Sequence, residues 1–271
     1  MSGTGPRLSG LGQFEAAEQT LPKAIGLRPQ YWDNYNELGN FYVKRGRYEE
    51  AIPMFRRITE LTPDNLWGYT NLGVAYYTLG QLDQAATMFR RTLEIQPDAL
   101  AYSNLGVVYY FTGHYADSAR MFEKATQLEH QNYSYWGNLA GAYRWAPGEE
   151  GRAKDAYTRA IALAEKSLEV NPRDTEVLGE LDGYHANTGA FEKARQLIGK
   201  ALAIAPKEPA LLGEAAKVYA QAGDLQKAFE YLKSSLQAGY PRLEIGASPE
   251  LAGLRKDPRY REIMNGAPKP R

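Results

Sequence analysis

The chain has no cysteine, which excludes disulfides, thiol catalysis and cysteine-based metal sites. Histidine is almost as scarce, with 3 residues in 271, and no cluster of His, Asp and Glu has the spacing of metal ligands. Lys and Arg together number 32, and so do Asp and Glu, so the chain lacks the basic excess of a nucleic-acid-binding protein. No apolar run approaches the roughly 18 residues of a membrane-spanning helix. We therefore expect no cofactor, no metal, no nucleic-acid partner and no insertion into a membrane.

The motifs of common enzymes are also missing. No GxSxG, P-loop or GxGxxG pattern stands between a strand and a helix, and no segment reads as a β-strand. We therefore do not expect an enzyme. The first ten residues, MSGTGPRLSG, lack the apolar core of a signal peptide. The compartment stays open, because a cysteine-free chain suits the cytoplasm and the periplasm alike, but we expect a soluble protein and favour the cytoplasm.

What the chain does contain is one phrase repeated with variations. It reads YNELGNFY at residues 35–42, YTNLGVAY at 69–76, YSNLGVVY at 102–109 and WGNLAGAY at 136–143. The leucines of successive phrases are 34, 33 and 34 residues apart. A fixed period near 34 predicts one supersecondary unit copied along the chain.

The residues that follow each phrase complete the pattern. After the second phrase come a glycine, a small residue, an aromatic ring and a proline, namely Gly80, Ala85, Phe89 and Pro97. This pattern resembles the tetratricopeptide repeat, a helix–turn–helix unit. The resemblance implies an all-α fold, a right-handed superhelix or α-solenoid, whose first helices line a concave groove that binds a protein or peptide partner.

The repeat pattern divides the chain into segments. We expect a flexible leader (1–11), half a repeat that supplies only a second helix (12–31), six full repeats (32–241), C-terminal capping helices (242–265) and a disordered tail (266–271). Asp64 and Asp98 are the expected N-caps of the helices that follow them. The fourth repeat has an unusually long second helix, expected from about Ala153 to Val170. The half repeat suggests a piece of a longer protein, and its uncovered face offers a surface for self-association.

A second resemblance covers roughly residues 30–265. The segments AIALAEKSLEVNPRD and SPELAGLRKDPRYREIM resemble the C-terminal tetratricopeptide region of large bacterial signalling proteins. In those proteins a serine/threonine kinase, a nucleotide cyclase or a winged-helix domain precedes the repeats. No catalytic motif of these domains occurs here, so the resemblance implies no catalysis by this chain.

Three asparagines at one register are the sharpest functional signal. Asn71, Asn104 and Asn138 each directly precede the repeat leucine, although asparagine is a mediocre helix former. A side-chain amide both donates and accepts, so a ladder of such residues suits the backbone of an extended peptide. The alternative is that each amide bonds locally. Glu180 and Glu214 replace the asparagine in later repeats, which confines any ladder to the middle of the chain.

Several further side chains belong to the predicted peptide site because they follow the core tyrosine of a first helix. They are Tyr77, Tyr110, Phe111, Arg144 and Trp145. The alternative is that they pack between repeats. Asn36 and Asn40 complete the set, but Asn36 stands where a lysine would be needed to clamp a C-terminal carboxylate, so we do not expect a receptor for chaperone tails.

One repeat carries an unusual polar pair. Asp182 and His185 occupy positions that ordinarily hold Gly or Ala and Tyr, and they share a helix face. We interpret them as a satisfied contact between helices or an open polar patch. Taken together, the sequence favours a non-enzymatic interaction module that binds an extended segment in its groove. The alternative is an oligomerisation or regulatory scaffold without a peptide ligand.

Overall fold

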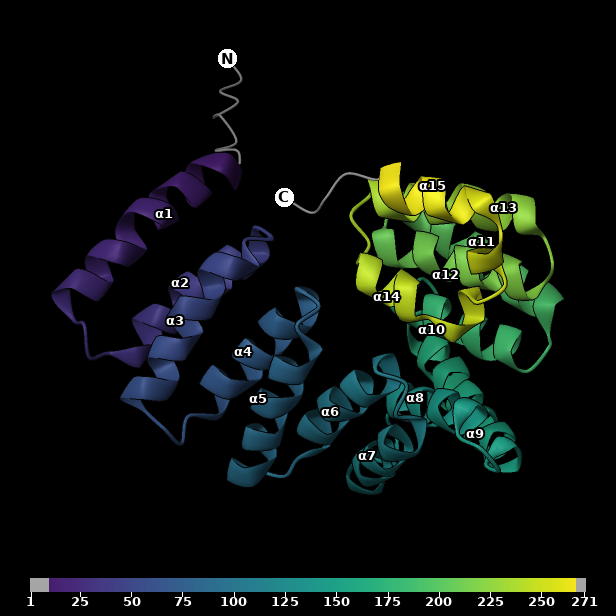
Figure 1. Cartoon of the computed structure of the whole chain (residues 1–271), viewed down its shortest axis with the longest axis horizontal. Helices are drawn as coiled ribbons and strands as arrows, with labels where there is room; N and C mark the ends of the chain where they lie inside the picture. Colours follow the sequence, from purple (N-terminus) through teal and green to yellow (C-terminus); the bar gives the residue numbers. More distant parts are fainter. Residues whose placement is uncertain (1–9, 267–271) are drawn as a thin grey trace, which may run out of the picture. The chain divides into compact units, whose positions relative to one another are not determined.

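The computed structural model describes the backbone of residues 10–266 and side chains from Glu18 onward. Within this range the chain forms fifteen α-helices and two short 3-10 helices and has no strand, so the all-α prediction is confirmed (Figure 1). The chain divides between Pro97 and Asp98 into two compact units. No helix within residues 10–266 has the length and apolarity needed to cross a membrane.

The first unit is a row of helices in which each packs against the next. It consists of α1 (Gly10–Leu27), α2 (Trp32–Lys44), α3 (Tyr48–Leu61), α4 (Leu66–Thr78) and α5 (Leu82–Ile95). Of the predicted leader, only Gly10 and Leu11 are described, as the first residues of α1. The side chains of residues 10–17, on which most of the apolar face of the half repeat depends, lie outside the described ones.

The second unit continues the alternation of first and second helices. It contains α6 (Ala99–Phe111), α7 (Tyr115–Leu128), α8 (Tyr133–Trp145), α9 (Glu150–Val170), α10 (Thr175–Asn187), α11 (Phe191–Ile204), α12 (Pro209–Gln221) and α13 (Leu225–Gln237). Besides packing on their own partners, α6, α8, α10 and α12 contact one another in that order. The first helices of this unit therefore form a continuous layer, which positions the site described below.

In the first three hairpins an aromatic ring of the second helix packs on a glycine of the first helix. Phe89 of α5 is 2 % exposed, and its ring lies directly against Gly73 of α4, so closely that a methyl group there would clash. Phe55 lies in the same way on Gly39 of α2. The glycine that follows the repeat leucine is thus needed to admit the ring of the second helix. Burying such a ring stabilises the hairpin by a few kcal/mol.

The turn glycines have the conformation that the repeat pattern predicts. Gly46, Gly80, Gly113, Gly189 and Gly223 end their first helices with φ between +71° and +83°, a region that other residues rarely adopt.

The last elements cover the apolar face of the final repeat. They are α14 (Arg242–Ala247), the 3-10 helices η1 (Pro249–Leu251) and η2 (Leu254–Lys256), and α15 (Pro258–Gly266). Ile245, Leu251, Leu254 and Tyr260 are buried in one cluster with residues of α12 and α13. Two short helices were expected in this segment, but the stretch at Pro249 forms only a 3-10 turn and α14 was missed. Gly266 ends α15, and the rest of the predicted tail lies outside the described residues.

Two predicted helix starts are wrong. The N-cap of α4 is Asn65, whose side chain accepts from the Gly68 backbone N–H at 3.2 Å, and not Asp64. Asp98 does cap α6, accepting from the Ala101 N–H at 2.8 Å. In the fourth repeat, α9 begins at Glu150, three residues before the expected start, because Gly148 alone makes the turn at φ +82°.

Truncating Phe89 to alanine should lower the free energy of unfolding by about 3–5 kcal/mol, because the ring fills the space above Gly73. Chemical denaturation followed by circular dichroism measures the change. Val74→Ala in the same hairpin is the matched control, since Val74 is 39 % exposed, and it should shift stability by less than about 0.5 kcal/mol. Equal stability of the two variants would contradict the role of the ring.

Candidate binding cavity

The second unit contains a cavity of about 410 Å³ on its layer of first helices. Its walls come from α6, α8, α10 and α12, and the turn around η1 closes one side. This volume lies within the range of small-ligand pockets. The lining residues used below are Tyr110, Phe111, Gly137, Asn138, Gly141, Tyr157, Glu176, Gly179, Glu180, Gly183, Tyr184, Asn187, Glu214, Lys217, Gln221, Ser248 and Glu250.

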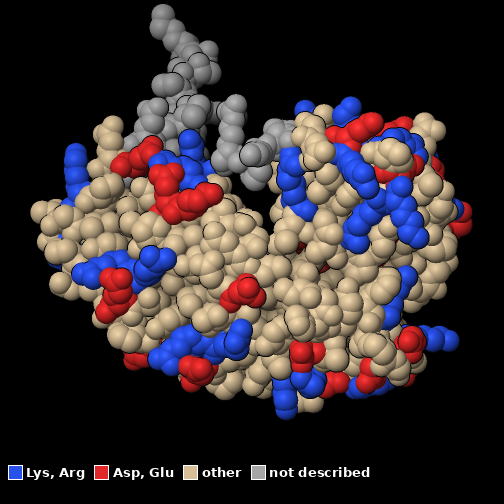
Figure 2. Space-filling model, in the orientation of Figure 1, with Lys and Arg blue, Asp and Glu red and all other residues tan. Residues whose placement is uncertain are grey.

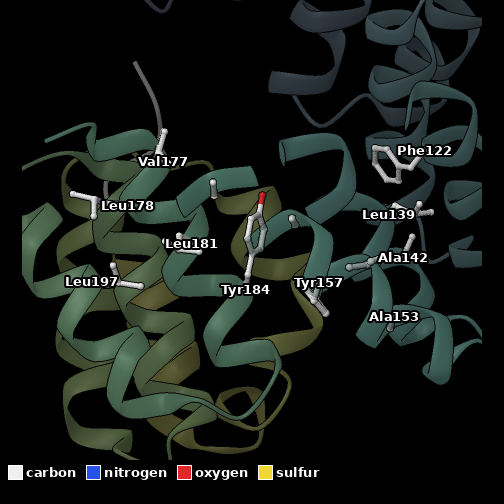
Figure 3. Close-up of a cluster of buried hydrophobic side chains, with 14 of the residues drawn as sticks. Phe122, Leu139, Ala142, Ala153, Tyr157, Val177, Leu178, Leu181, Tyr184 and Leu197 are labelled. Carbon is white, nitrogen blue, oxygen red and sulfur yellow. The ribbon is translucent and has the colours of Figure 1, made fainter. Parts of the chain in front are cut away.

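Five aromatic side chains, including Phe122 of α7, contribute to the apolar part of the wall. Tyr110 and Phe111 of α6 meet edge to face with ring centroids 5.5 Å apart. Tyr157 of α9 and Tyr184 of α10 follow, 6.1 Å apart. Figure 3 shows these two tyrosines between the leucines of α10 on one side and Phe122 and Leu139 on the other. The aromatic wall is therefore continuous with the hydrophobic core of the unit.

A half-buried ion pair occupies the α12 side of the cavity. The Lys217 ammonium lies 2.7 Å from the Glu214 carboxylate one turn earlier. Burial acts to lower the pKa of Lys217, but the charges of Glu214 and Glu250 outweigh it and hold the pKa well above its ordinary value. Lys217 is therefore charged, and it compensates the two carboxylates nearest to it.

Glu250 joins the C-terminal turn to α6. Its carboxylate accepts from the Tyr110 hydroxyl at 3.1 Å and from the Ser248 hydroxyl at 2.6 Å. Burial alone would raise the pKa of Glu250, but the Lys217 charge and these hydrogen bonds hold it below its ordinary value. Residues 140 positions apart in sequence thus meet at the cavity.

Glu180 lies on the α10 side without such compensation. It accepts from the Ser134 hydroxyl at 2.8 Å and from the hydroxyl of Tyr184. Burial raises the pKa of Glu180, and the neighbouring Glu176 and Glu214 add to the shift. Two hydroxyl donors leave a carboxylate with unused acceptor sites.

The predicted site residues of the second unit divide into two groups. Tyr110, Phe111 and Asn138 line the cavity. Asn104 is half-buried on α6 and does not line it. Arg144 donates to Gln221 at 3.3 Å and also to Asn187, so it ties α8 to α10 and α12 at one end of the cavity.

Trp145 turns away from the cavity. Its indole packs on Tyr115 of the preceding repeat with centroids 6.4 Å apart, and the Arg144 guanidinium lies 5.4 Å from the indole ring. This is the packing between repeats that the sequence left as an alternative.

The remaining predicted residues lie in the first unit. Asn36, Asn40 and Tyr77 are half-buried, as is Asn71. The Asn71 amide donates to the Asn36 Oδ1 at 3.0 Å, which links the same face of two successive repeats. This bond joins two repeats, so it is neither a bond to a peptide nor the local bond that was the alternative to a ladder.

Sequence reasoning missed the charged residues of the cavity. Glu180 and Glu214 were visible as replacements in the asparagine register, and that signal could have placed them on the groove face. Lys217 lies one turn beyond Glu214, at a position whose residue type the repeat pattern does not specify. Glu250 carries no signal, because its place depends on how the C-terminal turn folds back.

Glycines of this face differ in what they make room for. A side chain at Gly137 or Gly179 would collide with Tyr184 or Leu211, so these glycines admit neighbouring residues. At Gly141 and Gly183, an added Cβ would keep ordinary distances of 3.6–3.9 Å from its neighbours. Only these last two positions border open cavity space.

The Asp182–His185 pair is neither a satisfied contact nor an open patch. Asp182 is 0 % exposed and His185 7 %, and neither the Asp182 carboxylate nor the His185 Nε2 has a hydrogen-bond partner among the described residues. Burial, with the charge of Glu214, raises the pKa of Asp182 well above its ordinary value. The helix packing that ordinarily accepts Gly or Ala at this position encloses a carboxyl instead. Within residues 10–266, no group of three or more side chains is placed to hold a metal ion.

Comparison with known proteins identifies the repeats. Sequence profiles of the tetratricopeptide repeat match residues 33–98 and 99–128. No curated protein matches the chain in sequence. The chain therefore contains tetratricopeptide repeats, which are generally protein–protein interaction modules without catalytic activity.

Solved structures agree with this assignment at the level of the fold. A tetratricopeptide repeat protein from Parabacteroides merdae has a TM-score of 0.64 at 17% identity, over 92% of this chain and 94% of that one. The MamA protein has a TM-score of 0.54 at 21% identity, over 60% of this chain and 88% of that one. A thermophilic TPR protein of Thermus thermophilus has a TM-score of 0.52 at 22% identity, over 74% of this chain and 100% of that one. The fold is thus that of a tetratricopeptide-repeat α-solenoid.

Replacing Asp182 by alanine should raise the free energy of unfolding at pH 7 by about 1–3 kcal/mol, the usual cost of an unsatisfied buried polar group. Because the folded-state pKa is raised, the unfolded chain loses its proton first, and parent stability falls as pH rises from 3.8 toward the folded pKa. The advantage of the variant should therefore grow over this interval.

Denaturation curves of both proteins between pH 3.5 and 7.5 measure this difference. The lowered pKa of His185 acts in both proteins and cancels in the comparison to first order. A difference that does not change with pH would show that Asp182 titrates normally in the folded chain.

Proposed function

We propose that this chain is a non-enzymatic interaction module that receives an extended segment of a protein partner along the first helices of its second unit. The observation that supports the proposal is the cavity of about 410 Å³ bordered by α6, α8, α10 and α12. A layer of parallel first helices offers a partner several equivalent positions one repeat apart. A peptide that follows the layer would place one side chain in the cavity.

Two features support binding over catalysis at this site. Its titratable groups are engaged with one another, as Glu214 is with Lys217 and Glu250 with Tyr110. The one Ser or Thr among the lining residues is Ser248, whose hydroxyl donates to Glu250, and a carboxylate whose pKa is held low is a weak base. Such an arrangement holds shape and charge in place and does not activate a nucleophile.

Within this function, we assign residues 32–241 to six repeats, 12–31 to half a repeat and 242–265 to a cap. The cap takes part in the site, because Ser248 and Glu250 belong to it and line the cavity.

Filling the cavity should abolish binding without unfolding the chain. The variant G141L/G183L places two side chains in the open space, and leucine is the better helix former at both positions by roughly 0.8 kcal/mol each. The matched control is Gly199→Leu on the exposed face of α11, where an added Cβ meets nothing within 4 Å. The ligand is a peptide selected from a random heptapeptide display library on the full chain, and calorimetry gives its affinity.

We expect the G141L/G183L affinity to fall at least about tenfold and the G199L affinity to stay at the parent level. Equal affinities for all three proteins would show that the peptide does not bind on this layer. Failure of the folded parent to select any peptide would favour the scaffold role, with self-association through the half repeat.

Removing the groove amides should weaken binding more modestly. Asn104→Ala with Asn138→Ala should cost about 1–3 kcal/mol, roughly five- to 150-fold, if each amide makes one net hydrogen bond to the peptide backbone. Helicity should not fall, because alanine is the better helix former. The control is Gln196→Ala, which removes an exposed amide from the second helix α11. Titration with the same selected peptide measures the affinity of each variant. If the double variant bound the peptide as tightly as the parent, the asparagine ladder in this unit would be refuted.

A further inference from the structure

We propose that the cavity receives the positively charged side chain of a lysine or arginine carried by the bound segment. This inference rests on the groove function proposed above and adds the chemistry of the partner. The recognised position is basic, and not acidic or purely apolar.

The charge of the cavity differs from that of the outer surface. On the face in Figure 2, acidic and basic side chains lie interspersed, in keeping with the zero net charge of the chain. The cavity, by contrast, is lined by four glutamates, Glu176, Glu180, Glu214 and Glu250, and by one lysine, Lys217. Even with Arg144 counted at its end, carboxylates outnumber cations by two.

The excess negative charge is concentrated on the α10 side. Lys217 lies 2.7 Å from Glu214 and acts electrostatically on Glu250, so the α12 and η1 sides have one cation for two carboxylates, whereas the α10 side has two glutamates and no lysine. Glu180 receives only hydroxyl donors, from Ser134 and Tyr184. Glu180 is half-buried, and a partly desolvated carboxylate paired with neutral donors alone lacks a countercharge. An ammonium or guanidinium group at this point would complete it with a charge-assisted hydrogen bond.

The aromatic wall suits the same kind of ligand. The aliphatic stem of lysine or arginine can lie along Tyr110, Phe111 and Tyr184 while its charged end reaches a carboxylate. The faces of tyrosine and phenylalanine also attract a cation directly. An anionic side chain would meet the four glutamates, and an apolar one would bury Glu180 further without compensating it. The walls and the charge therefore select one class of side chain.

The test uses pools of heptapeptides, acetylated and amidated at their ends, that differ only in a fixed central residue. The central residue is lysine, arginine, norleucine or glutamate, and the flanking positions are equal mixtures of Ala, Ser, Gln and Val. Each pool is passed over the immobilised full chain, and the retained fraction is measured by mass spectrometry. The norleucine pool keeps the length of the lysine stem and removes its charge.

The test variant is E176Q/E180Q, which removes two negative charges from the α10 side. Glutamine at 180 keeps an oxygen that can accept from Ser134 and Tyr184, so the local packing is preserved. The control E169Q/E208Q removes the same charge from two exposed positions outside the cavity. Thermal melts establish that all proteins are folded, and the single variant Glu180→Gln serves if the double variant is not.

We expect the parent and the control to retain the lysine and arginine pools about tenfold or more above the norleucine pool, the value of one charge-assisted hydrogen bond. E176Q/E180Q should lose this preference. If the parent binds the norleucine pool equally well, the cationic inference is overturned while the groove function stands. If the preference survives in E176Q/E180Q, the cation binds elsewhere and the assignment to this cavity is wrong. If the folded parent retains no pool, the groove function itself fails.

Discussion

The fold of the first three hairpins depends on one contact, a phenylalanine ring of the second helix packed on a glycine of the first helix. Phe55, Phe89 and Phe122 lie on glycines, and the ring position is Tyr157 in the fourth repeat. Because the ring fills the gap between two helices of one hairpin, each unit is stable only at one spacing and angle. The helices α6, α8, α10 and α12 contact one another in that order and form one layer, which lines the cavity.

The site arises where the later repeats depart from this rule. Glu180 and Glu214 take the register of the asparagines, Lys217 pairs with Glu214, and the C-terminal turn supplies Glu250. These charged side chains are half-buried, and withdrawing charge from water in this way costs stability. Asp182 belongs to the same region and has a carboxyl without a hydrogen-bond partner among the described residues. Because these residues lower the stability of the fold, we expect this part of the solenoid to be the one that binds a partner.

The helices could be predicted from the sequence because their signals are local. The repeat leucine, the turn glycine and the ring position each report on contacts within about 34 residues, and all recur. Local signals can also misplace the start of a helix by a residue or a turn. The N-cap of α4 is Asn65 and not Asp64, and α9 begins at Glu150, before its expected start. The cavity was beyond such reasoning. Glu250 meets Tyr110 across 140 residues, and Trp145 turns toward Tyr115, and neither depends on a repeating pattern.

The central claim is that the layer of first helices in the second unit binds an extended segment and holds a basic side chain in its cavity. A crystal structure of the full chain with the selected peptide tests it most directly. The account predicts peptide backbone running across α8 and α10, with a lysine or arginine nitrogen about 2.7–2.9 Å from a Glu180 oxygen. A peptide seated on the second helices, with the cavity empty, would contradict it.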